Sequence, residues 1–218
     1  MSASKEHVAD PHRLTRERIV DEALALVELE GADGLTMRNL GAALAVDPTA
    51  VYRHFRDKDE LLHAMADRLF GDMADGIRAH DDWRDVLRDN AWKGRRVYLS
   101  HPGLARILSL SPEVLGNHLR ISEALLAALR AAGLSEADAA MAFHANVNYV
   151  SGVSSLDAAV QGAEAGYGAW KRVYASLDVS EFPNCVAAAP HLFPSDDEQF
   201  EFGLELLIEA IAARTASA

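Results

Sequence analysis

The residues best suited to chemistry lie in one short stretch, DPTAVYRHFRDKDELL (residues 47–62). Its four basic side chains are Arg53, His54, Arg56 and Lys58. Arginine binds guanine or phosphate, and lysine binds phosphate. Residues 36–58 hold four Lys or Arg against two Asp, a local net charge of +2, in a chain whose formal net charge is -12. We therefore interpret this stretch as a cationic, DNA-facing surface on an acidic protein.

Short helices must hold this surface. Apolar residues from Ile19 onward follow helical spacing, with Thr15 as the expected cap. A second helix is expected to start at Thr36, and Asp47 followed by Pro48 predicts the start of a third. A connection of about three residues between two short helices is typical of a helix-turn-helix, whose second helix enters the major groove of DNA.

The expected third helix has an inner and an outer face. Val51 and Phe55 lie four residues apart and are expected to face the core. The methyl groups of Thr49 and Ala50 suit contact with a thymine methyl, and Arg53 suits guanine or phosphate. Tyr52, His54 and Lys58 are placed for backbone phosphates. The alternative interpretation is a small helical subdomain with a solvated charged rim.

The rest of the chain predicts further helices, without strand alternation. Typical N-terminal capping pairs are Asp57 with Glu60, Ser135 with Asp138, and Ser195 with Glu198. Residues 178–194 contain three prolines and predict a mobile loop.

The expected fold class is therefore all-α, in two domains. A flexible tail (residues 1–12) precedes a three-helix helix-turn-helix DNA-binding domain (13–60). A larger helical domain for effector binding and dimerisation (61–218) follows.

Composition and motifs argue against other classes of protein. Cys185 is the single cysteine, which fits a reducing cytosol, and the first residues lack the apolar segment of a signal peptide. We find no glycine-rich phosphate loop, no nucleophile elbow and no paired metal ligands, so we expect neither catalysis, nor a cofactor, nor a metal. No apolar run is long enough for a membrane span, and a cytoplasmic location is expected.

The residues from Leu14 to Met65 carry a specific resemblance. LTRERIVDEALALVELEGADGLTMRNLGAALAVDPTAVYRHFRDKDELLHAM resembles the DNA-binding head of the tetracycline-repressor (TetR) family without a gap. WRDVLRDNAWKGRRVYLSHPG, LLAALRAAGLSEADA and FEFGLELLIEAI resemble the C-terminal domain of the tetracycline-repressor subgroup. The resemblance implies an all-helical homodimer that binds a palindromic operator and releases it when a small molecule enters the C-terminal domain.

The resemblance also assigns roles to residues. It places Thr36, Arg38, Pro48, Thr49, Tyr52, Arg53, His54 and Lys58 on DNA-contacting positions. The residues at Pro48, Thr49, Ala50 and Arg53 differ from those of the tetracycline repressors, which implies a different operator. Asn90 matches a polar ligand contact of the subgroup. Leu108 falls where the subgroup has its magnesium-coordinating histidine, so tetracycline–magnesium recognition is not expected.

The middle helices supply the candidates for an effector pocket. Each apolar member has bundle core as its alternative role, and His101, before Pro102, has a helix-end cap as its alternative. Buried asparagines at 90, 146 or 148 would need partners that a ligand or water can supply. The effector-binding candidates are Leu69, Met73, Asn90, Arg95, Tyr98, His101, Leu104, Leu108, His118, Phe143, His144, Val147 and Tyr149.

Two segments are the expected dimer surface, SEADAAMAFHANVNYVSGVSSLDAAV and DEQFEFGLELLIEAIAAR. Small residues permit close helix approach, and Phe202, Leu206 and Ile211 add apolar area. Two such helices from each chain would form a four-helix bundle.

The preferred function is a repressor that leaves its operator on binding a small effector. The first alternative is a helical carrier or bundle enzyme without DNA binding. The second is a regulator controlled by a protein partner. The sequence does not identify the effector or the operator.

Overall fold

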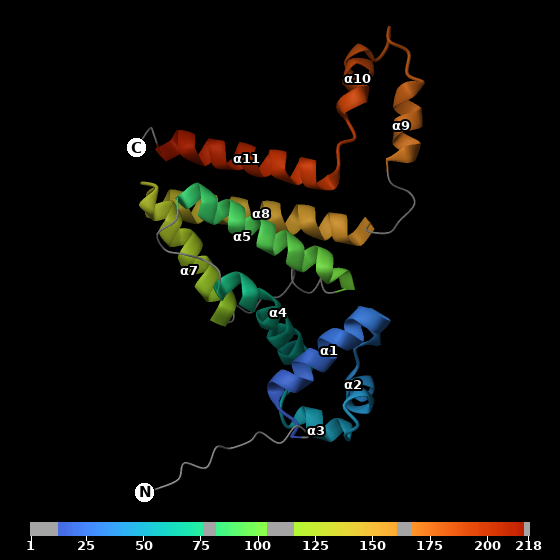
Figure 1. Cartoon of the computed structure of the whole chain (residues 1–218), viewed down its shortest axis with the longest axis vertical. Coiled ribbons are helices and arrows are strands. Elements are labelled where there is room, and N and C mark those ends of the chain that lie inside the picture. Colours follow the sequence, from blue (N-terminus) through green and yellow to red (C-terminus); the bar gives the residue numbers. More distant parts are fainter. Residues whose placement is uncertain (1–12, 76–81, 104–115, 161–166, 216–218) are drawn as a thin grey trace, which may run out of the picture. The chain divides into compact units, whose positions relative to one another are not determined.

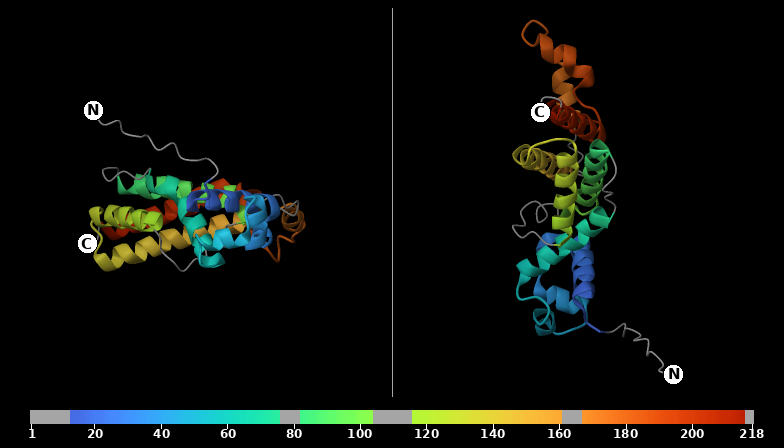
Figure 2. Two further views of the ribbon diagram at one scale, coloured as in Figure 1. Left: turned by 90° about the horizontal axis from the view of Figure 1, so that it is seen from below. Right: turned by 90° about the vertical axis from the view of Figure 1, so that its left-hand side faces the viewer.

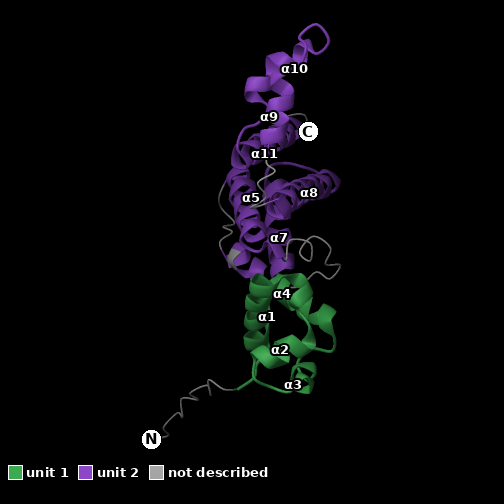
Figure 3. Ribbon diagram, turned by 90° about the vertical axis from the view of Figure 1, so that its right-hand side faces the viewer, with its two compact units in different colours: residues 1–68 green, residues 69–218 purple. Residues whose placement is uncertain are grey.

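A computed structural model describes residues 13–75, 82–103, 116–160 and 167–215. All regular elements in these ranges are helical, which confirms the all-α class (Figure 1). The tail 1–12, Leu104 and Leu108 lie outside the described residues. The chain divides into two compact units, residues 1–68 and 69–218 (Figure 3). The sequence places the domain boundary after residue 60, whereas this division falls inside a continuous helix.

The N-terminal unit contains α1 (Arg16–Glu30), η1 (Ala32–Gly34), α2 (Met37–Ala43), α3 (Pro48–Tyr52) and the first part of α4 (Lys58–Asp75). Fully buried side chains of its core are Ile19, Ala23, Leu40, Val51, Phe55, Leu61 and Met65. Leu61 and Met65 belong to α4, which explains why the unit extends past residue 60.

The helix starts follow the capping residues of the sequence. Thr15 accepts a hydrogen bond from the Arg18 N–H at 3.2 Å, and Thr36 accepts one from the Asn39 N–H at 3.0 Å. Asp47 caps α3 and Pro48 occupies its first turn. These starts confirm the three-helix prediction, because a cap acts within three residues of itself.

The connection from α2 to α3 depends on two small residues. Ala45 adopts φ 56°, the left-handed conformation that turns the chain sharply. A Cβ added at Gly41 would lie 3.1 Å from the Val46 carbonyl oxygen and 3.2 Å from the Pro48 Cα. Glycine at position 41 therefore lets the backbone of α3 approach α2 closely.

The C-terminal unit packs α5 (Trp83–Ser100), α7 (Gly116–Ala131), α8 (Glu136–Val160) and α11 (Asp196–Thr215) around one apolar core. α5 runs along α8 in the same direction, and α11 returns along α8 in the opposite direction (Figures 1 and 2). Central core residues are Leu87, Ala91, Leu125, Leu129, Phe200 and Leu204.

Two expectations for this unit are corrected. Residues 178–194 are not simply a loop, because they contain α10 (Pro183–Ala188) and η2 (Ala189–His191) after α9 (Gly168–Ala175). Pro183 stands in the first turn of α10, where a proline needs no N–H partner. The sequence predicts Ile211 on the dimer surface, whereas the structure buries it in the core of its own chain. The Ser135 and Ser195 caps are confirmed.

Candidate nucleic-acid interface and ligand pocket

α3 presents the expected outer face because its inner face is anchored. Val51 and Phe55 are fully buried. The candidate residues Thr36, Arg38, Thr49, Tyr52, Arg53 and Lys58 are exposed, and Pro48, Ala50 and His54 are half-buried. Tyr52 keeps 51% of its surface open although it is large and aromatic. The structure thus leaves these side chains accessible, as a DNA-contacting role requires.

The Thr49 hydroxyl is engaged at the start of α3. Asp47 Oδ1 accepts hydrogen bonds from the Thr49 N–H at 2.9 Å and from its hydroxyl at 2.6 Å. These two bonds lower the pKa of Asp47. Since the hydroxyl proton is taken, the Thr49 methyl is the group left for an apolar contact such as a thymine methyl.

Arg16 of α1 braces the far end of α3, which sequence reasoning missed. Its guanidinium lies over the Phe55 ring at 4.0 Å and donates to the His54 carbonyl and to Glu60 Oε1. Glu60 also accepts from the Arg56 N–H at 2.7 Å. The residues are 38 and 44 positions from Arg16, so local patterns give no signal for this contact.

The start of α4 is only partly free to bind an anion. Asp57 Oδ1 accepts from the Glu60 N–H at 2.8 Å, and Asp57 Oδ2 accepts from Arg56 Nε at 2.8 Å. One N–H expected to face phosphate is therefore already bonded. Lys58 remains exposed beside it.

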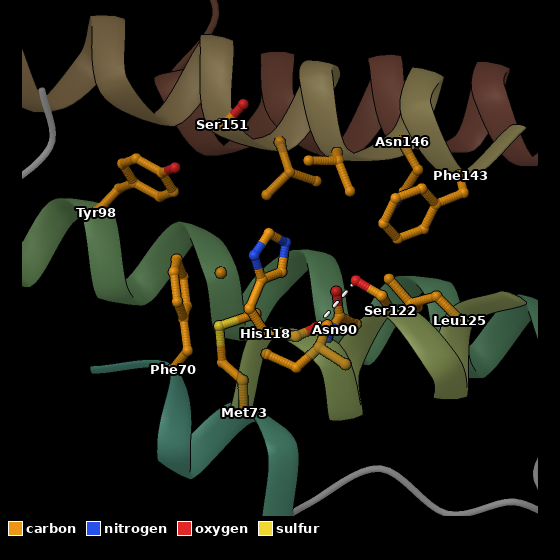
Figure 4. A pocket seen from close by; sticks show the side chains of 14 residues that line it. Phe70, Met73, Asn90, Tyr98, His118, Ser122, Leu125, Phe143, Asn146 and Ser151 are labelled. Carbon is orange, nitrogen blue, oxygen red and sulfur yellow. Dashed lines mark hydrogen bonds between the residues drawn. The ribbon is translucent and has the colours of Figure 1, made fainter. Parts of the chain in front are cut away.

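The C-terminal unit contains a pocket between α4, α5, α7 and α8 (Figure 4). Its volume is about 480 Å³, including the open solvent at its mouth. Six expected residues meet there: Met73, Asn90, Tyr98, His118, Phe143 and Val147. Asn146, which the sequence analysis considers as a buried polar group, also lies in the lining. The lining residues that the sequence analysis does not name are Phe70, Gly94, Ile121, Ser122, Leu125, Val150 and Ser151. On α8, these continue the helical face of Phe143, a spacing that could have identified them.

Other effector candidates have structural roles or lie elsewhere. His101 ends α5 as its C-cap, His144 is exposed, and Leu69 is half-buried outside the lining. The Tyr149 hydroxyl donates to the Phe200 carbonyl at 2.8 Å. These four residues lie outside the described lining of this pocket.

Arg95 also stands outside the pocket lining. It is 1% exposed, and it donates to Asp157 at 2.6 Å and to Asp197 at 2.9 Å. Its guanidinium also lies 4.7 Å from the centre of the Phe200 ring. Arg95 therefore joins α5 to α8 and to the start of α11, because two carboxylates and an aromatic face surround its charge.

Two asparagines give the pocket its polarity. Asn90 is 5% exposed and Asn146 is 1% exposed. Asn90 Nδ2 and Asn146 Oδ1 are buried without a hydrogen-bond partner. Asn148, the third asparagine considered, is exposed. Buried polar atoms are nearly always bonded, so these two atoms are available to a ligand or a water molecule.

Neither a cluster of metal ligands nor a membrane-spanning helix occurs in residues 13–75, 82–103, 116–160 and 167–215. In these ranges no three His, Cys, Asp or Glu side chains gather as metal ligands do. None of the helices there combines the length and apolarity of a membrane span.

α8 and α11 each carry an exposed apolar stripe. On α8 it includes Met141 at 69% and Leu156 at 66% exposure, with the small exposed residue Gly152 between them. On α11 it includes Phe202 at 69% and Leu206 at 52% exposure. The two helices lie side by side (Figure 1). Exposed apolar side chains of this kind often mark protein interfaces.

Comparison with known proteins agrees with this arrangement. Residues 19–65 match the family described as bacterial regulatory proteins, tetR family, and residues 77–215 match the tetracyclin repressor-like C-terminal domain. An HTH-type transcriptional regulator of Saccharopolyspora erythraea is 32% identical over 205 residues, covering 92% of this chain and 85% of the relative.

Solved structures agree as well. The transcriptional regulator SCO7222, a TetR from Streptomyces coelicolor, is 32% identical with a TM-score of 0.81, covering 92% of this chain and 99% of that one. The S. coelicolor TetR family protein ActR in complex with actinorhodin is 28% identical with a TM-score of 0.78, covering 93% and 99%. The chain therefore belongs to the TetR family of DNA-binding transcriptional regulators.

Proposed function

We propose that this regulator represses transcription as a homodimer and leaves a palindromic operator when a small molecule occupies the pocket. The main support for DNA binding is the outer face of α3, where Tyr52 and Arg53 are exposed while Val51 and Phe55 are buried. A helix held in this way can enter the major groove without unfolding its support. Relatives named as repressors and the ligand complexes of ActR support the proposal.

The head residues divide into base readers and phosphate binders. Arg53 and the methyl groups of Thr49 and Ala50 would read base edges. Phosphates would be held by Thr36, Arg38, Tyr52, His54 and Lys58. Pro48 would set the start of α3, since its ring fixes the backbone of the first turn.

Dimerisation would pair the α8 and α11 stripes of two chains. A homodimer joins the same surface on both subunits, so an exposed apolar stripe on each chain suits it. One head covers one half-site, and a second head must lie about 34–36 Å away to reach the next major groove on the same DNA face.

α4 would carry the signal from pocket to head. Leu61 and Met65 on this helix belong to the buried core of the N-terminal unit, and Met73 lines the pocket. An effector that prefers one position of α4 would change the geometry of the heads. It can shift the balance only by the difference in its affinity for the two states.

The test is operator binding by Arg53→Ala across a series of salt concentrations. Loss of sequence preference with a nearly unchanged salt slope would support base reading by Arg53. A uniform loss with a shallower slope would reassign Arg53 to phosphate contact. The matched control is Arg172→Ala, which removes the same charge from exposed α9 and should leave operator binding unchanged.

A further inference from the structure

We infer the chemical class of the effector from the two asparagines, an inference that rests on the proposed function. The pocket takes a neutral, ring-containing molecule that offers a hydrogen-bond acceptor to Asn90 Nδ2 and a hydrogen-bond donor to Asn146 Oδ1. Both atoms are buried and unpartnered in the described structure. One needs an acceptor and the other a donor, so a single ligand can satisfy both.

The two amides lie at the same level of the pocket. α5 and α8 run in the same direction (Figure 1). They approach closely at Gly94, where an added Cβ would lie 3.0 Å from Val150 Cγ1. Asn90 and Asn146 each stand four residues, about one turn, before this contact. One compact ligand can therefore meet both amides.

Rings suit the remaining walls. Phe70, Tyr98 and Phe143 contribute aromatic side chains, and the His118 ring lies 6.1 Å from that of Phe70 (Figure 4). Apolar side chains from Met73, Ile121, Leu125, Val147 and Val150 complete the lining. Flat apolar rings gain from contact with such surfaces.

A neutral ligand follows from the lack of charge in the described lining. The described lining contains no Lys, Arg, Asp or Glu side chain. Arg95 is already paired with Asp157 and Asp197. An ionised ligand would lose its water without gaining an opposite charge from these residues, whereas a hydroxyl and a carbonyl would gain the two amides.

Benzoin, deoxybenzoin and benzilic acid are suitable probes. Benzoin carries two rings, a hydroxyl donor and a carbonyl acceptor. Deoxybenzoin lacks the hydroxyl, and benzilic acid carries a carboxylate. Calorimetric titration of the full-length protein should show binding in the order benzoin, deoxybenzoin, benzilic acid.

Two variants assign the hydrogen bonds. Asn146→Leu should weaken the binding of benzoin about tenfold and leave the binding of deoxybenzoin unchanged, because only benzoin donates a hydrogen bond to Asn146. Asn90→Leu should weaken both ketones by a similar factor. Asn148→Leu, at an exposed position of α8, is the matched control and should change neither affinity.

The thermal stability of the ligand-free variants gives a second test that does not depend on the choice of probes. The apo melting temperature of Asn90→Leu and Asn146→Leu should equal or exceed that of the wild type, because each change removes an unpaired buried amide. A marked decrease in both would mean that the amides support the fold, and would overturn the inference.

The remaining outcomes are also decisive. Preferred binding of benzilic acid, or absence of binding by both ketones, would overturn the inference about ligand class. If operator binding persists in that case, the proposed function stands. If the wild-type protein binds no operator at all, the proposed function itself is contradicted.

Discussion

Replacing Arg95 should destabilise the C-terminal unit, because Arg95 forms a clasp, meaning its ion pairs with Asp157 and Asp197. The Arg95 side chain is 2% exposed. It pairs with Asp157, whose side chain is 16% exposed, and with Asp197, whose side chain is 67% exposed. Arg95→Met keeps the length and apolar stem of the side chain and removes the charge. Asp157 would then remain partly buried without its partner.

The structure fixes the expected size of the effect. Breaking a buried ion pair from one side costs about 3–5 kcal/mol. Because both carboxylates are partly accessible to water, we expect the loss of stability in Arg95→Met to lie at the lower end of this range, about 3 kcal/mol. Asp197→Asn should cost less than about 1 kcal/mol, because exposed ion pairs contribute little. For a chain of this length, about 3 kcal/mol lowers the melting temperature by roughly 6–12 °C.

The assay is thermal and urea unfolding at one fixed protein concentration, since dimerisation makes stability depend on concentration. Arg95→Met/Asp157→Leu should recover much of the loss, because well-packed apolar residues can replace a buried pair. If Arg95→Met is no less stable than Asp197→Asn, the clasp does not exist. If it instead abolishes effector binding at full stability, Arg95 belongs to the ligand site.

Three further predictions concern the head, the pH response and the dimer. Arg16→Met should weaken operator binding severalfold without changing the preferred sequence, because Arg16 braces the end of α3. Gel shifts on operator variants would measure both properties. A changed sequence preference would contradict this prediction. The hydrogen bonds from Arg88 lower the pKa of Glu205, so its stabilisation is present above the ordinary value of about 4.3 and is lost as pH falls through the lower pKa of the folded state. Urea unfolding between about pH 6 and pH 3 should therefore show a shallower acid loss for Glu205→Gln, and an unchanged profile would refute this. Phe202→Lys should yield monomers by light scattering, whereas Leu119→Lys, at an exposed site on α7 away from the stripes, should not; equal effects would exclude the α11 stripe as the interface.

Local signals predicted the helix starts well. Asp47 with Pro48 and Ser195 with Glu198 act within a few residues, so the sequence carries their complete interaction. The three prolines of residues 178–194 predict a loop, whereas the structure has a helix there. Pro183 stands in the first turn of α10 rather than breaking a helix, and sequence spacing alone does not separate the two roles.

Long-range contacts could not be predicted in this way. Arg95 meets partners 62 and 102 residues away, so its assignment to the pocket rested only on its position in a middle helix. The α8 face from Phe143 to Ser151 follows helical spacing and was partly predictable. Ile121 and Leu125 on α7 required knowledge of which face of that helix packs toward α5 and α8.

The most direct measurement is a selection of the full-length protein on random-sequence DNA, followed by the stoichiometry of the complex. Enrichment of a palindrome, with half-sites spaced for successive major grooves and two chains bound, is the expected result. Enrichment of no sequence, or binding of one chain to a site without symmetry, would contradict a dimeric operator-binding regulator.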